Sequence, residues 1–165
     1  MEFAVGDGVM YPSRGAGRIT GVEHIELVEG FEHYYVIDIP SERLIVRIPV
    51  RKVADLGLRP VMSETKLGDV LGVLRSKPDK LADDYKERQL LIDEQIKTGS
   101  AMRMAAVIRD LTWRLRVHYL TKRDGDLLNQ ARDLLVTEMA VATDREVSAL
   151  QEEIDTALLE HVSEA

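Results

Sequence analysis

The residues of this chain whose types could carry chemistry are a group of glycines near the N-terminus and four histidines. Gly15-Ala16-Gly17 has the look of a loop that cradles phosphate. A dinucleotide-binding loop, however, needs the spacing G-x-G-x-x-G followed at once by a helix, whose N-terminus meets the pyrophosphate. Here the next residues are Arg18-Ile19-Thr20-Gly21 and then more strand-like sequence. The spacing therefore favours a bending strand over a nucleotide site.

The histidines do not form a recognisable metal-binding or catalytic pattern. They lie on separate stretches, at His24, His33, His118 and His161. We expect His24 and His33 to face each other across a hairpin as an ordinary cross-strand pair. No nucleophile-elbow motif is present, and the absence of cysteine excludes disulfides and thiolate ligands. The sequence therefore predicts a protein that is not an enzyme and that has no cofactor and no metal site.

The composition is that of a soluble globular protein, with 45% hydrophobic and 31% charged residues in 165. No apolar run approaches the ~20 residues that span a bilayer, and the first residues lack the features of a signal peptide. We expect a cytoplasmic protein with no membrane contact. The net charge of −7 argues against a simple polyanion binder, but eight acids and one base lie after residue 137. Residues 75–135 hold thirteen bases and ten acids, which leaves room for a modest basic face.

The first sixty residues are typical of short strands joined by tight turns. We predict strands at residues 9–12, 18–28, 31–39 and 44–50. Side chains alternate between the two faces of a strand. Alternation along 44–50 places four apolar residues on one face and Ile45 and Arg47 on the other. So many short strands in so few residues predict a small, strongly bent β-barrel.

The pattern changes to helical spacing near residue 60. We predict five helices, at about residues 63–75, 80–97, 101–119, 121–142 and from 143 onward. Thr121 and Asp124 have the spacing of a capping box, with Asp in place of Glu, and Thr143 and Glu146 have the full motif. The predicted fold class is α+β, with a β module in residues 1–60 and an all-α five-helix domain in residues 61–165.

Two aromatic residues of the helical part have different expected roles. Trp113 lies on a second apolar side of its helix, which predicts packing inside the bundle. Tyr85 fits a loose apolar stripe, but it also lies within a very polar helix start, Asp83 to Arg88. An exposed aromatic there could stack on a base or insert at the edge of a DNA groove. Both readings of Tyr85 remain open at this point.

Four stretches, in order along the chain, resemble the CarD/CdnL family of bacterial transcription regulators. The likeness runs nearly from end to end. The matching stretches are Phe3-x-Val5-Gly6-Asp7-x-Val9-x-Tyr11-Pro12-x-x-Gly15, Val46-Arg47-Ile48-Pro49-Val50 with Val53 and Gly57-Leu58-Arg59, Val107-Ile108-Arg109-Asp110-Leu111, and Ala131-Arg132-x-Leu134-Leu135-x-x-Glu138-x-Ala140.

The resemblance implies that the N-terminal module is an SH3/Tudor-like barrel that docks on the β subunit of RNA polymerase. The same type of module occurs in the transcription-repair coupling factor. Docking in the family uses an exposed strand, a form of sheet augmentation. The positions that match here are His24, Ile25, Glu26, Leu27, Ile45 and Arg47. Arg47 has an alternative reading as a solubilising surface residue.

The resemblance also implies that the helical domain contacts promoter DNA at the upstream edge of the melted region. A tryptophan early in the second helix of family members wedges into the minor groove, and Tyr85 stands at that position here. Lys86 and Arg88 match neighbouring basic residues, with Glu87 between them, and Arg114 and Arg116 could extend the patch. Binding is then expected to be independent of sequence and weak, with a Kd of about 10⁻⁴ to 10⁻⁶ M, so that occupancy depends on tethering to polymerase.

The leading interpretation is a monomeric regulator that docks on RNA polymerase and stabilises the open promoter complex. The alternative is a protein-protein adaptor, in which the helical domain binds a protein partner and not DNA. The acidic fifth helix is compatible with packing on the bundle, with mimicry of nucleic acid or with a further partner.

Overall fold

The computed structural model describes residues 3–12 and 14–160, except for the side chains of Leu27 and Val28. The chain divides into two compact units, Met1–Val61 and Met62–Ala165, and each is described by itself. The boundary that the sequence suggests lies between residues 60 and 61.

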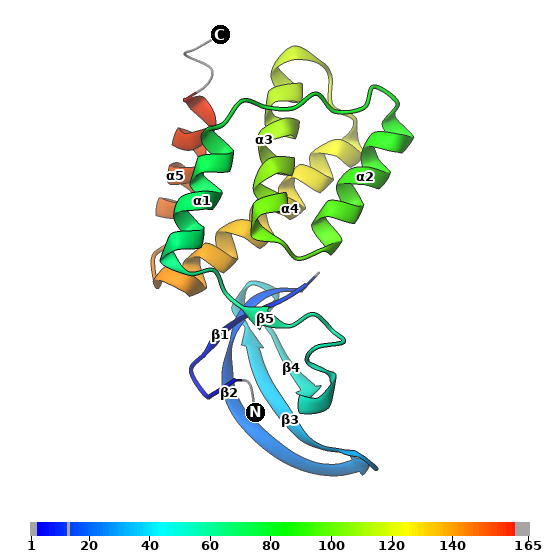
Figure 1. Ribbon diagram of the computed structural model, residues 1–165, viewed down its shortest axis with the longest axis vertical. Helices are drawn as coiled ribbons and strands as arrows, with labels where there is room; N and C mark the ends of the chain where they lie inside the picture. The colour runs from blue at the N-terminus through cyan, green and yellow to red at the C-terminus, as the bar shows by residue number, and fades with distance from the viewer. Residues whose placement is uncertain (1–2, 13, 161–165) are drawn as a thin grey trace. The chain divides into compact units, whose positions relative to one another are not determined.

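The first unit is an antiparallel sheet of five strands in the order β4-β3-β2-β1-β5 (Figure 1). Two single-turn 3-10 helices lie on either side of β4. The strands are β1 (Gly8–Tyr11), β2 (Gly15–Val28), β3 (Phe31–Ile39), β4 (Leu44–Pro49) and β5 (Arg59–Pro60). β2 and β3 form a long, curved hairpin in Figure 1, with Gly30 at the turn in a left-handed conformation (φ 86°). This turn lies where the sequence predicts it.

β2 bends where its glycines are. A Cβ atom at Gly17 would collide with the backbone carbonyl of Asp38 on β3, so only glycine allows the two strands to approach so closely. The pairing of β2 with β3 then shifts register between Ile19 and Gly21, which is the irregularity of a β-bulge. The glycines therefore shape a strand, and no helix follows them.

The core of the β unit lies on one face of β2, β3 and β4. Tyr35, Ile37 and Ile39 alternate along β3 and are completely buried. On β4, Ile48 is buried while Ile45 and Arg47 are exposed, as the alternation predicts.

The described residues of the second unit form five helices, with α3 at the centre of the α1, α2 and α4 contacts. Their bounds are α1 (Glu64–Arg75), α2 (Tyr85–Lys97), α3 (Ala101–Val117), α4 (Lys122–Thr143) and α5 (Val147–Leu159). α3 packs against α1, α2 and α4, and α5 packs against α1 and α4 (Figure 1). The buried side chains Met104, Ile108 and Leu111 of α3 contribute to this core. The α+β fold class, with a β unit before five helices, is confirmed.

Buried carboxylates fix two loops of the helical unit. The Glu138 carboxylate is completely buried in α4 and accepts a hydrogen bond from the backbone N–H of Met62 (2.8 Å). The Asp110 carboxylate accepts one from the backbone N–H of Asp79 (2.9 Å). Arg109 holds the same loop, because it donates to Asp110 (2.8 Å) and to the hydroxyl of Ser76 (2.8 Å).

Two predicted helix starts are wrong. α2 begins at Tyr85 rather than at residue 80, because Asp84 caps it by accepting a hydrogen bond from the N–H of Glu87 (3.0 Å). The capping box predicted at Thr143 and Glu146 does not form. α4 continues through Thr143, whose hydroxyl donates instead to the carbonyl of Met139 (2.7 Å), and α5 has no side-chain cap.

Candidate functional site

Within residues 3–12 and 14–160, no group of three His, Asp or Glu side chains is placed to hold a metal ion. Over the same residues no helix has the length and apolar character needed to cross a membrane.

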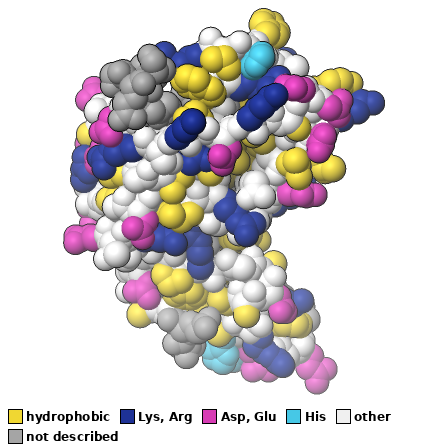
Figure 2. Space-filling model, turned by 45° about the horizontal axis from the view of Figure 1, so that its top comes forward, with side chains coloured by type: hydrophobic (Ala, Val, Ile, Leu, Met, Phe, Trp, Pro, Cys, Tyr) yellow, Lys and Arg dark blue, Asp and Glu magenta, His cyan; other side chains and the backbone are white. Residues whose placement is uncertain are grey.

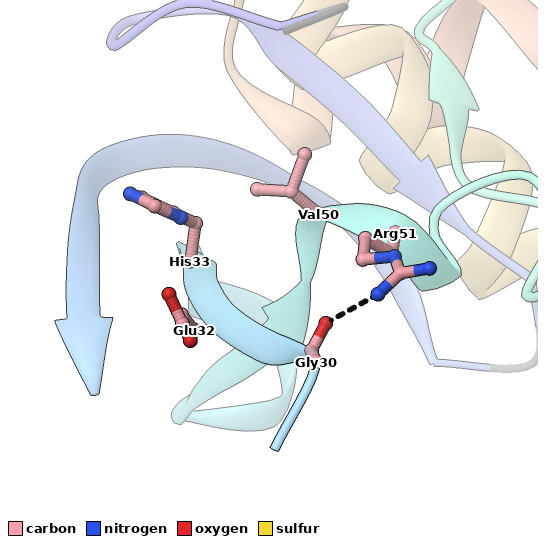
Figure 3. A pocket seen from close by; sticks show the side chains of 5 residues that line it. All are labelled: Gly30, Glu32, His33, Val50 and Arg51. Carbon is pink, nitrogen blue, oxygen red and sulfur yellow. Dashed lines mark hydrogen bonds between the residues drawn. The ribbon is translucent and has the colours of Figure 1, made fainter. Parts of the chain in front are cut away.

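One hollow in the β unit lies beside the β2–β3 turn (Figure 3). It has a volume of about 520 Å³ and is lined by Gly30, Glu32, His33, Val50 and Arg51. The Arg51 guanidinium is bound to the hairpin, because Nη1 donates to the carbonyl of Gly30 (2.8 Å). The most direct effect of this hydrogen bond is to hold the hairpin turn.

The predicted docking residues of β4 lie on the outer face of the sheet. β4 is an edge strand, and Ile45 is 59% exposed. The Arg47 guanidinium forms two contacts with the Glu23 carboxylate of β2, at 2.9 Å (Nε to Oε2) and 3.5 Å (Nη2 to Oε1). The hydrogen bond from Arg47 lowers the pKa of Glu23 below its ordinary value, so the pair is charged at neutral pH.

The predicted docking residues of β2 are arranged differently. His24 stands directly opposite His33 in the register, and the two rings stack with centroids 5.1 Å apart, which confirms the expected cross-strand pair. Nε2 of His24 also lies 3.5 Å from the exposed Glu26 carboxylate. Ile25 is half-buried, and the side chain of Leu27 lies outside the described part of the structure. The two groups of predicted docking residues thus come from strands on opposite sides of β3.

In the helical unit, Tyr85 is the first residue of α2, and its side chain is 51% exposed. The neighbouring Lys86 is also exposed, with its ammonium 5.9 Å from the centre of the Tyr85 ring. The exposed alternative for Tyr85 is therefore the one that agrees with the structure. The two side chains together offer a flat aromatic surface beside a cation.

Arg88 does not belong to this exposed group. Its side chain is only 2% exposed, and its guanidinium forms a two-contact ion pair with the fully buried Asp124 of α4 (2.8 and 3.1 Å). Nη1 donates to the backbone carbonyls of Ala82 and Asp83, at 3.0 Å each. The prediction that Arg88 contacts DNA is not compatible with this burial, because a phosphate cannot reach the guanidinium without breaking the ion pair.

The two arginines near the end of α3 differ in exposure. Arg116 is exposed, but the side chain of Arg114 is only 12% exposed and lies 3.8 Å from Asp83. Nε of Arg114 is buried without a hydrogen-bond partner among the described residues. Trp113, which the sequence places in the bundle, is half-buried beside Arg114 at a hollow of about 260 Å³. Of the two arginines, Arg116 is the one more accessible to a phosphate.

The surface of the helical unit is mixed in charge. Figure 2 shows Lys and Arg side chains among acidic and hydrophobic ones on the face in view, with no continuous basic patch. Sequence reasoning missed Tyr119, which is 88% exposed between α3 and α4 and is the most exposed large hydrophobic residue among the described residues of this unit. Its only signal in the sequence is its position two residues before the Thr121 cap.

Comparisons with known proteins agree with this two-part organisation. The family model "CarD-like/TRCF RID domain" matches residues 3–62, and "CarD, C-terminal domain" matches residues 69–155. The chain is also similar to a Bacillus subtilis (strain 168) protein named "Putative transcription factor YdeB". The two are 30% identical over 139 residues, which cover 84% of this chain and 91% of the relative.

Proposed function

This chain belongs to the CarD family of transcription factors, and from this we propose that it docks on the β subunit of RNA polymerase and stabilises the open promoter complex. It is a transcription regulator, and the domain type at residues 3–62 implies interaction with RNA polymerase in general. The observation that carries the proposal is the order of the two family matches, one on each compact unit.

The edge strand β4 is the proposed polymerase-docking surface. An edge strand presents unpaired backbone N–H and C=O groups to which a partner strand can add. Ile45 supplies an exposed apolar side chain beside that edge, and Arg47 supplies a guanidinium that can bind a carboxylate in a fork-like geometry. Both features suit a strand of the polymerase β subunit that carries an acidic residue.

The start of α2 is the proposed DNA contact. Tyr85 supplies a flat ring that can stack on an unpaired base or insert at a groove edge. Lys86 of α2 and Arg116 of α3 supply exposed cations for phosphates, whereas Arg114 is largely buried beside Asp83. Two exposed cations give weak binding that does not depend on base sequence. The DNA contact therefore relies on the polymerase to bring it to the promoter.

A second candidate function is that of a protein-protein adaptor. The helical unit exposes the large apolar side chains Leu90 (61%), Leu115 (56%) and Tyr119 (88%). Exposed apolar groups of this size are also found where proteins bind one another. In that case the helical unit holds a protein, and the Tyr85 surface has no part in promoter opening.

Two measurements on the full-length protein test the proposal. The first is capture of bacterial RNA polymerase by the parent, by Arg47→Glu and by the control Arg14→Glu, which reverses an exposed charge before β2. The second is the lifetime of the polymerase-promoter open complex with the parent, with Tyr85→Ala and with the control Leu91→Ala, which truncates another exposed side chain of α2. We expect only Arg47→Glu to abolish capture and only Tyr85→Ala to shorten the lifetime. Retained capture by Arg47→Glu excludes the β4 surface, and an unchanged lifetime with Tyr85→Ala favours the adaptor.

A further inference from the structure

The buried ion pair between Arg88 and Asp124 joins the beginnings of two helices. Arg88 lies on the first turn of α2, and Asp124 is the third residue of α4, 36 positions later in the chain. Neither is accessible, with exposed fractions of 2% and 0%. A charged pair placed this deeply contributes little net stability compared with apolar side chains of similar size. Net stability alone therefore does not account for the pair, and its contacts suggest a positioning role.

The Asp124 carboxylate is completely occupied. It accepts hydrogen bonds from Nε and Nη2 of Arg88, from Nε2 of Gln89 (3.3 Å) and from the backbone N–H of Thr121 (3.1 Å). The last of these belongs to the capping box that begins α4. Gln89 also donates to the Thr121 hydroxyl (2.9 Å). One carboxylate thus caps α4 and holds the first turn of α2.

The guanidinium of Arg88 extends this connection to the segment before α2. Its third nitrogen, Nη1, donates to the carbonyls of Ala82 and Asp83, the second and third residues before Tyr85. Asp84, between them and Tyr85, caps the helix. The backbone on both sides of Tyr85 is therefore fixed, whereas its ring is half exposed. Such preorganisation removes much of the entropy that a mobile backbone segment would lose on binding.

We propose that Arg88 and Asp124 are positioning residues: their ion pair, together with the bonds from Arg88 to the carbonyls of Ala82 and Asp83, fixes Tyr85 at the start of α2 in the orientation that meets a nucleic-acid base. That Tyr85 meets a nucleic-acid base rests on the proposed function. The fixing of the segment itself is a property of the free protein and is tested separately.

The first test is Arg88→Lys in the full-length protein. Lysine keeps the charge next to Asp124 but lacks the planar fork that reaches the carboxylate and the two carbonyls together. We expect faster hydrogen exchange of the amides of residues 82–88 in the free protein, by about tenfold or more. A second variant, Arg88→Met with Asp124→Leu, removes both charges at once. This double variant is used if Arg88→Lys does not fold, because replacing both members of a buried ion pair by apolar residues is often neutral for stability.

The second test asks whether the Arg88–Asp124 ion pair acts through Tyr85. We expect Arg88→Lys to shorten the open-complex lifetime at least about fivefold, which corresponds to the loss of one stacked aromatic. In a double-mutant cycle, Arg88→Lys should have no further effect in the Tyr85→Ala background. The control is Arg132→Met with Asp155→Leu, which removes the ion pair between α4 and α5 (2.8 Å) and should change neither measurement.

The outcomes distinguish failure of the positioning role of Arg88 and Asp124 from failure of the proposed function. Unchanged exchange of residues 82–88 in both Arg88 variants overturns the inference, and so does a full additional loss of lifetime in the Tyr85→Ala background. If Tyr85→Ala itself leaves the lifetime unchanged, the DNA role of Tyr85 is excluded, while the exchange experiment still decides whether Arg88 and Asp124 fix the segment.

Discussion

Arg47 of β4 and Glu23 of β2 form an ion pair across β3, although their strands are not neighbours in the sheet. Arg47 stands opposite Val36 in the register, and Glu23 stands opposite Tyr34, so the pair crosses β3 diagonally. Residues directly opposite each other in antiparallel strands project on the same face. The proposed docking arginine is therefore already bound to a carboxylate in the free protein, and a partner must compete for it.

This competition leads to a prediction for Glu23→Gln. The variant removes the internal carboxylate and leaves Arg47 available, so we expect RNA polymerase to bind severalfold more tightly, with a larger dependence on salt. Binding to immobilised polymerase at two salt concentrations measures both effects. The matched control is Glu32→Gln, which removes an exposed acid of β3. Weaker binding by Glu23→Gln would show that Glu23 itself contacts the polymerase or presents Arg47 to it.

A prediction on acid stability concerns Asp124. Burial on its own raises the pKa of Asp124, but hydrogen bonds from Arg88, Thr121 and Gln89 outweigh burial and hold the pKa below its ordinary value. A carboxyl group whose pKa is lowered by folding stabilises the protein at pH values above its unfolded-state pKa. This contribution is lost as the pH falls through the folded-state pKa. We expect Asp124→Asn to cost about 3 kcal/mol at pH 7 and much less at pH 2.

Urea unfolding followed by the fluorescence of Trp113, the only tryptophan, reports on the helical unit and measures this difference. Asp155→Asn is the control, because its carboxylate forms an ion pair with Arg132 but is 58% exposed. An equal loss from Asp124→Asn at both pH values would show that the charge of Asp124 is not what stabilises the fold.

Two glycines of β2 allow a matched test of strand packing. Gly17→Ala would bring a Cβ atom against the Asp38 carbonyl, and we expect a loss of about 2 kcal/mol. Gly21→Ala meets no atom within 4 Å and should change stability by less than about 1 kcal/mol, in the stabilising direction. Hydrogen exchange of the β2 and β3 amides under native conditions measures both. Similar losses in the two variants would mean that the backbone freedom of glycine, and not the close approach, determines the cost.

The cation beside Tyr85 gives a prediction on salt dependence. Lys86→Gln should weaken binding of the polymerase-bound protein to forked promoter DNA equally for different sequences. It should also reduce the slope of log K against log salt by about 1, as expected for one lost phosphate contact. Lys97→Gln, at the other end of α2, is the control because its ammonium pairs with Asp93 (2.8 Å). An unchanged slope for Lys86→Gln would place the DNA elsewhere.

The parts of the fold that depend on neighbouring residues could be predicted from the sequence. Strand alternation correctly places Ile45 and Arg47 outside, and the Thr121 capping box forms with Asp124 as its acid. The same local motif at Thr143 fails because α4 continues through that residue. Whether a capping box forms at Thr143 depends on where α4 ends, and the four residues of the motif do not determine that.

The candidate site also shows that local sequence patterns do not predict contacts between distant residues. The polar stretch from Asp83 to Arg88 has the pattern of an exposed helix start, and this is correct for Tyr85 and Lys86. It is wrong for Arg88, whose partner lies 36 residues away on another helix. Periodicity gives the face of a helix on which a residue lies, but it does not identify a distant carboxylate that balances a buried charge.

The double role of Asp124 has a consequence for how sequences of this kind can diverge. A change at Asp124 removes one of the two hydrogen bonds of the α4 capping box and at the same time leaves the Arg88 guanidinium without its counterion. A change at Arg88 leaves a buried carboxylate. Neither position can drift freely while the other stays as it is, so the two are expected to be inherited together or replaced together. Lys86, which is exposed and lies two positions before Arg88, is not bound by this constraint.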